Sequence, residues 1–285
     1  MSRIRVACGQ ITWGRGYSQE QVLDEIARAG YEGAPVGRYG DLRAKDVLDL
    51  YRRHGLRPAP GYLGLEWWNP TLRPQLLDQA ARQAAFAREL GVTELYVASN
   101  LTAERRAVAG RVTAATTTPT EELRKLADLL DEIGRMALRE GVRACFHNHV
   151  GSPVETRDEI DRLFTLVDSD VVFQGPDLGH LAWAGDDVVQ FVRDYGRSIK
   201  TLHLKDISPT VLAKGVAEKW GYQDFSDHGI FVELGEGMVD IPGVCEALSA
   251  AGFEGWIVVE TDVTQKSTPL ESALVSRRYL RSIGV

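Results

Sequence analysis

Four residues of types that commonly bind transition metals follow short apolar runs in the second half of the chain. They are His147, Asp177, His203 and Glu260. Each preceding run is predicted to be a buried strand. The carboxyl ends of parallel strands meet at one rim, where α/β barrels place their active sites, so we expect these side chains to converge. Two imidazoles and two carboxylates suit Mn²⁺, Co²⁺, Fe²⁺ or Zn²⁺ better than Ca²⁺ or Mg²⁺, and we favour Mn²⁺.

Strand alternation predicts more polar side chains at the same rim. Across residues 201–206, a period of two places Thr201, His203 and Lys205 on one face and the leucines on the other. We expect the polar face to be the interior of the barrel. Lys205 therefore becomes a candidate catalytic residue.

The same reasoning adds two histidines. His149 shares a face with His147, because two positions separate them in the predicted strand and its end. The segment 176–180 reads as a turn that can aim His180 into the mouth of the barrel. We therefore expect His149 and His180 beside the candidate ligands.

Strand-like and helix-like patterns alternate along the whole chain. Strands are expected at 5–12, 33–36, 56–63, 94–98, 142–146, 171–173, 199–202 and 256–259. Helices are expected at 18–29, 44–54, 73–90, 120–140, 156–167, 187–195, 241–251 and 268–282. Parallel strands need crossover helices and eight such units close naturally, so we predict a single-domain (β/α)8 TIM barrel over residues 1–285. An open doubly wound sheet is the alternative.

Two connections are too long to be simple turns, 99–119 and 206–240. Both leave the carboxyl ends of predicted strands. Long connections in compact domains are usually functional lids or mobile segments, so we expect them to cover the site.

Composition bounds the class of protein. The chain has 285 residues, 44% of them hydrophobic, which is enough to bury a full core. Its 33 Lys and Arg against 40 Asp and Glu give a net charge of -7, which disfavours a nucleic-acid or anionic-membrane partner. Cys8, Cys145 and Cys245 are widely spaced and suit reduced thiols. No export signal or membrane span is recognised, so we expect a soluble, cytoplasmic protein.

Several motifs together resemble the xylose-isomerase-like TIM-barrel superfamily of sugar isomerases and epimerases, closest to its inosose dehydratase branch. They occur in order along the second half of the chain. They are FHNHVG at 146–151, PDLGH at 176–180, WAG at 183–185, HLKD at 203–206, LGEG at 234–237 and VVE at 258–260. The early segments 10–13 and 29–33 also match, so the resemblance covers nearly the whole chain.

The resemblance implies an enzyme that holds one divalent cation through His147, Asp177, His203 and Glu260. Two features depart from the superfamily pattern. Its epimerases usually carry Glu at the position of His147, which argues against a simple two-carboxylate epimerase mechanism. Its second strand usually ends in a carboxylate, whereas this chain offers Arg38, which we expect to hold a polar or anionic group of the substrate.

We therefore predict enolisation followed by elimination on a keto-sugar or keto-cyclitol, as in a dehydratase or a keto-glycoside lyase. His149 or Glu260 would remove the α-proton, and Lys205 or His180 would protonate the leaving oxygen. Epimerisation, in which the proton returns to the opposite face, is the alternative reaction.

Two tryptophans, Trp13 and Trp183, are expected to form an apolar wall against a sugar ring. Apurinic endonucleases of the same superfamily use three zinc ions and need histidines from early strands, but only His54 precedes His147. DNA repair is therefore disfavoured. A non-catalytic or accessory barrel that binds a sugar stays open, as do a homo-oligomer and a partner subunit.

Overall fold

The computed structural model describes residues 4–36 and 42–285. Parallel strands form the wall of the fold: β1 (Arg5–Cys8), β2 (Gly33–Pro35), β3 (Arg57–Ala59), β4 (Gly61–Leu65), β5 (Glu94–Ser99), β6 (Arg143–His147), β7 (Val172–Gln174), β8 (Thr201–Leu204) and β11 (Trp256–Val259). They pair in two groups, in the orders β3-β2-β1-β11-β8 and β4-β5-β6-β7.

Two junctions close these groups into a ring. On one side β3 continues into β4 through Pro60, whose missing N–H interrupts the hydrogen-bond ladder. On the other side, single parallel bridges join Gln174 to Ile199 and Asp177 to His203. The wall is therefore a closed TIM barrel, as the alternating pattern predicts, and not an open doubly wound sheet.

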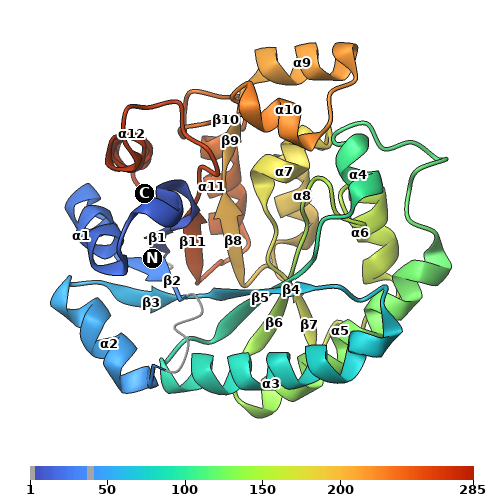
Figure 1. Ribbon diagram of the computed structural model, residues 1–285, viewed down its shortest axis with the longest axis horizontal. Coiled ribbons are helices and arrows are strands. Elements are labelled where there is room, and N and C mark those ends of the chain that lie inside the picture. Colours follow the sequence, from blue (N-terminus) through green and yellow to red (C-terminus); the bar gives the residue numbers. More distant parts are fainter. Residues whose placement is uncertain (1–3, 37–41) are drawn as a thin grey trace.

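Helices cover the outside of this wall (Figure 1). They are α1 (Gln19–Ala29), α2 (Ala44–Arg53), α3 (Arg73–Glu89), α5 (Thr120–Arg139), α6 (Arg157–Phe164), α8 (Val188–Tyr195), α11 (Ile241–Ala250) and α12 (Pro269–Ser282). All eight expected helices are confirmed, with only their ends shifted. Local signals set the ends: Ser18 and Gln21 form a capping box at the start of α1, and Gly30 closes it in a left-handed conformation.

The first expected strand is wrong in its second half. β1 stops at Cys8, and a short 3-10 helix (Ile11–Gly16) follows. Inside that segment Gly14 has a φ of +59°, which an extended strand does not allow. Trp13 lies in this 3-10 helix and not in a strand.

The two long connections contain regular elements that the sequence patterns did not reveal. The first holds α4 (Ala103–Ala107), and the second holds β9 (Asp206–Ile207), α9 (Pro209–Glu218), α10 (Tyr222–Asp227) and β10 (Phe231–Val232), with β9 and β10 antiparallel. α10 contacts both α9 and α4, and the three stand together at one end of the molecule (Figure 1). The expected turn at 176–180 is also different, because it begins a further helix, α7 (Leu178–Trp183).

Two sets of apolar side chains fill the fold. The larger lies between the wall and the helices, while a separate small set fills the barrel interior with Ala7, Ala59, Tyr96, Trp256 and Val258. Among the described residues, no helix combines the length and the apolar composition that a membrane span requires.

The interior set is tied to β8 by a buried hydrogen bond of 2.6 Å between the Tyr96 and Thr201 hydroxyls. Thr201 also donates to the Trp256 carbonyl at 3.0 Å. The expected inward direction of Thr201 is therefore confirmed.

Removing this hydroxyl pair should weaken the barrel by an amount that depends on which partner is lost. Tyr96→Phe should lower the free energy of unfolding by about 1 kcal/mol, because Thr201 keeps its bond to Trp256. Thr201→Val should cost about 2 kcal/mol, because it leaves the buried Tyr96 hydroxyl without a partner. Urea unfolding measures both, and equal costs would contradict the assignment.

Candidate active site

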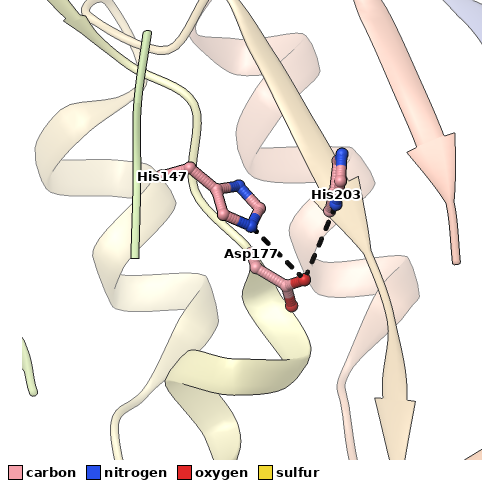
Figure 2. A group of neighbouring side chains, drawn as sticks. All are labelled: His147, Asp177 and His203. Atoms are coloured by element: carbon pink, nitrogen blue, oxygen red, sulfur yellow. Dashed lines mark ion pairs between the residues drawn. The ribbon is translucent and has the colours of Figure 1, made fainter. Parts of the chain in front are cut away.

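Two histidines face one carboxylate at the mouth of the barrel (Figure 2). His147 ends β6, Asp177 follows β7, and His203 lies in β8, so three neighbouring strands deliver them. Asp177 Oδ2 lies 4.0 Å from His147 Nε2 and 3.8 Å from His203 Nδ1. All three side chains are buried.

Neighbouring groups hold these side chains in ligand orientation. The His147 Nδ1 group donates to the Gly175 carbonyl at 3.0 Å, which leaves the Nε2 lone pair facing Asp177. Asp177 Oδ1 caps α7 by accepting from the His180 N–H at 3.0 Å. Its Oδ2 is buried and has no hydrogen-bond partner among the described residues. The Asn148 amide clamps the Asp177 backbone on both sides, at 3.0 and 3.2 Å.

Glu260 completes the candidate ligand set from the end of β11. Its Oε2 lies 3.2 Å from His203 Nδ1. A Cβ on Gly9 would stand 2.6 Å from Glu260 Oε1, so the carboxylate fits only because residue 9 has no side chain. Burial raises the pKa of Glu260, but His203 and Lys205 beside it hold the pKa well below its ordinary value.

Lys205 is buried among carboxylates. Its Nζ lies 3.1 Å from Asp177 Oδ2, 3.3 Å from Glu260 Oε2 and 2.5 Å from Asp262 Oδ1. Burial lowers the pKa of Lys205, but these carboxylates together raise it well above the ordinary value. Burial also raises the pKa of Asp262, to about 6, against the opposing effect of Lys205.

The charges, and the Asp177 Oδ2 that accepts no hydrogen bond among the described residues, fit a divalent cation. Three carboxylates against one ammonium leave two negative charges in a buried space, which costs free energy unless a cation balances them. His147, Asp177 and His203 offer one ligand atom each, all within 4.8 Å of one another. Together with Glu260 they form the mixed nitrogen and oxygen set that suits Mn²⁺, Fe²⁺, Co²⁺ or Zn²⁺.

A wall of rings adjoins this cluster. The His149 and His180 ring centroids lie 3.6 Å apart, and Trp183 stacks on His180 at 5.9 Å. Tyr222 of α10 stacks on Trp183 at 5.3 Å, so the long connection after β8 packs on this wall.

The hydrogen bonds of the two histidines define their lone pairs. His149 Nδ1 donates to the Val150 carbonyl at 2.7 Å, so its Nε2 is free to accept a proton. His180 Nε2 accepts from Lys205 Nζ at 3.2 Å. Burial, and then Lys205, lowers the pKa of His149 to about 4. His149, His180 and Asp262 form a second group of potential metal ligands. The Lys205 ammonium already lies 2.5 Å from Asp262 and 3.2 Å from His180.

The three residues expected to bind the substrate are not all found beside the candidate ligands. Trp13 is buried in the larger apolar set, where its Nε1–H donates to Glu25 of α1 at 2.7 Å, so its expected place on the substrate wall is not supported. Trp183 does join the wall but is only 1% exposed, so it supports His180 from behind. Arg38 lies outside the described residues.

Two site residues escaped the sequence patterns. Asp262 lies two positions beyond Glu260, and that spacing was the available signal. Tyr62 of β4 meets the His147 ring edge-on, with the centroids 5.3 Å apart. It also lines a hollow of about 510 Å³ that includes Glu66 and Asn100, a size in the range of small-molecule sites.

Comparisons with known proteins agree with this geometry. A family model described as Xylose isomerase-like TIM barrel matches residues 23–283. The inosose dehydratase of Geobacillus thermodenitrificans is 30% identical over 287 residues, covering 96% of this chain and 90% of that protein. The inosose dehydratase of Clostridium beijerinckii is 29% identical over 282 residues, covering 94% and 90%.

Solved structures with the same fold are more distant in sequence. An IolI protein with a bound zinc atom has a TM-score of 0.76 at 16% identity, covering 98% of this chain and 97% of that one. A probable 3-DHS dehydratase, AsbF from Bacillus anthracis, has a TM-score of 0.74 at 12% identity, covering 97% and 98%.

Asp177→Asn should abolish tight binding of a divalent cation, because it replaces the Oδ2 that faces both histidines with an amide nitrogen, while Oδ1 can still cap α7. Isothermal titration with Mn²⁺ should show an affinity loss beyond the roughly 10- to 100-fold that loss of a supporting partner causes. Asp262→Asn is the control and should keep its metal content. Equal losses in both variants would argue against the ligand assignment.

Proposed function

We propose that this chain, which belongs to the xylose isomerase-like TIM barrel family, is a metal-dependent lyase that removes a β-substituent from a keto-sugar or keto-cyclitol. The chain is an enzyme of the lyase or isomerase type, and relatives named inosose dehydratase align over 94% to 96% of it. Elimination of water from a keto-cyclitol is therefore the first reaction to consider.

The proposal depends on one arrangement, a free base and an ammonium beside the ligand cluster. His149 offers its Nε2 lone pair, and Lys205 offers protons. His180 lies between them, in ring contact with His149 and 3.2 Å from Lys205 Nζ. An acid and a base that lie together can remove a proton and protonate a leaving oxygen on neighbouring carbons.

The cation supplies one part of the chemistry. A divalent cation held by His147, Asp177, His203 and Glu260 would act as a Lewis acid toward the substrate carbonyl. From the donor set, we propose that this cation is Mn²⁺.

The protein's own groups carry the proton transfers. His149 Nε2 takes the proton from the carbon next to the carbonyl, and the C–H electron pair forms a C=C bond. The C–O bond to the β-substituent breaks, and Lys205 gives a proton to the departing oxygen, so a hydroxyl leaves as water. Asp262, at 2.5 Å, holds the ammonium in place for this step.

The grouping of these residues favours elimination over epimerisation. His149, His180 and Asp262 present ligand-type atoms within 4.8 Å of one another, and Lys205 lies among them. An epimerase needs groups on opposite faces of one carbon, whereas these groups form one continuous wall. His147 also provides no second carboxylate for a two-carboxylate exchange.

Proton NMR in D2O on the Mn²⁺-loaded enzyme distinguishes the two reactions. The panel contains 2-keto-myo-inositol, 3-keto-glucosides and ketohexoses, with metal removed before acquisition. We expect loss of a β-substituent and a new enone or diketone. α-Deuteration with only a change of configuration would instead make the chain an epimerase.

Replacing the proposed base or acid should lower turnover without loss of metal. His149→Gln and Lys205→Met should each reduce kcat by about 10²- to 10⁴-fold, the usual contribution of a positioned acid or base. His228→Gln is a matched control, because His228 is exposed and stacks on Trp220 away from the cluster. Steady-state kinetics beside metal analysis checks this, and full activity of His149→Gln would exclude it as the base.

A further inference from the structure

We propose that Glu155 is a positioning residue for this reaction, whose buried carboxylate fixes the loop that carries His149 against the segment that packs on Trp183. The inference rests on the proposed function, since it assigns a task toward the proposed base. Glu155 is fully buried and follows β6 by several residues. It lies behind the wall of rings and not in it, so it cannot itself touch the reacting carbon.

The carboxylate of Glu155 joins two separate segments. Its Oε1 accepts from the Gly110 N–H at 2.7 Å, in the long connection after β5. Its Oε2 accepts from the Gly151 N–H at 2.9 Å, in the loop after β6. The Gly151 carbonyl in turn accepts from the Thr102 N–H at 3.0 Å. The Glu155 side chain and this backbone bond therefore hold the two segments together.

The loop after β6 carries the proposed base directly. His149 lies two positions before Gly151, and the Ser152 N–H donates to the His149 carbonyl at 3.1 Å. A shift of Gly151 therefore moves the backbone that aims His149. Misplacement of a catalytic group by about 1 Å can cost about 100-fold in rate.

The other segment supports the wall from behind. Gly110 has a φ of +67°, and a Cβ there would stand 2.7 Å from Trp183 Cδ1, so its backbone presses on the indole. Trp183 stacks on His180, which contacts His149 at 3.6 Å. Glu155 thus reaches His149 by two routes, through the loop itself and through the stacked rings.

The charges around Glu155 make its bonds sensitive to pH. Two charged groups face it, Arg105 of α4 at 3.6 Å and Glu159 of α6. Arg105 is already bound through two nitrogens to Glu159, at 2.7 and 2.8 Å. Burial raises the pKa of Glu155 to about 7, against the lowering effects of the two backbone N–H groups and Arg105.

The sign of the linkage follows from that direction. Because the folded-state pKa lies above the ordinary 4.5, the folded protein retains a proton that the unfolded chain releases. Stability from this group is therefore full below pH 4.5 and is lost as the pH rises to about 7. Both oxygens of Glu155 accept hydrogen bonds fully only when the carboxyl group is ionised, so the two segments are held best above pH 7. In that range Glu155 adds nothing to the free energy of unfolding.

The test compares Glu155→Gln with Glu94→Gln in the Mn²⁺-loaded, full-length protein. Glutamine keeps the shape of Glu155 but turns one acceptor into a donor, so hydrogen exchange at Gly110 or Gly151 should accelerate about tenfold. kcat should fall about tenfold or more with KM within about twofold. Glu94→Gln removes a similarly buried carboxylate that bonds to Thr93 and Arg143 and to neither glycine, and it should keep both amides protected.

Wild-type protein provides a second readout that needs no variant. After correction for intrinsic exchange, protection at Gly110 and Gly151 should rise between pH 6 and 8, together with kcat, and Glu155→Gln should lack that rise. Unchanged protection and an unchanged pH profile in Glu155→Gln would overturn the proposal, as would flat protection in the wild type. If no substrate is turned over, the proposed reaction fails, while the exchange data still decide whether Glu155 holds the two segments.

Discussion

The barrel closes and the site forms at the same contact between two strands. β7 and β8 meet only through isolated bridges among the described residues, and one of these pairs Asp177 with His203. The His203 N–H donates to the Pro176 carbonyl at 2.9 Å, which fixes the register there. The same backbone contact therefore completes the wall and brings two candidate ligands within 3.8 Å of each other. Metal binding at these residues would also hold the barrel closed.

Buried charge gives this junction its second property. Lys205 partly balances Asp177, Glu260 and Asp262, and the two negative charges that are left over make a divalent cation favourable. The Lys205 ammonium lies 2.5 Å from Asp262 Oδ1 and 3.2 Å from His180 Nε2, while His147 and His203 both face Asp177 Oδ2 (Figure 2). The same carboxylates, Asp177 and Glu260, therefore face both the ammonium and the candidate ligand histidines.

Sequence patterns could predict the parts of the site that follow from strand geometry. His147, Asp177, His203 and Glu260 converge because each lies at or just beyond the carboxyl end of a parallel strand. The inward direction of Lys205 follows from alternation. Patterns failed where the chain leaves a regular element. Trp13 packs toward α1 where a 3-10 helix replaces the end of the strand, and Asp262 lies past the end of β11, two positions after Glu260. Tyr62 was missed because Pro60 divides its strand and hides the period.

The long connections show why loop function was harder to predict than loop position. Their length predicted a cover for the site, and Tyr222 of α10 does pack on the wall of rings. What sequence could not supply was how they are held, because this depends on contacts between distant segments. The Arg106 guanidinium lies 5.6 Å above the Tyr222 ring, and Arg111 donates to the Trp220 carbonyl at 2.6 Å. The first connection thus supports the second. A movement of α4 or Gly110 would reach Trp183 both through Tyr222 and through the direct contact of Gly110 with the indole.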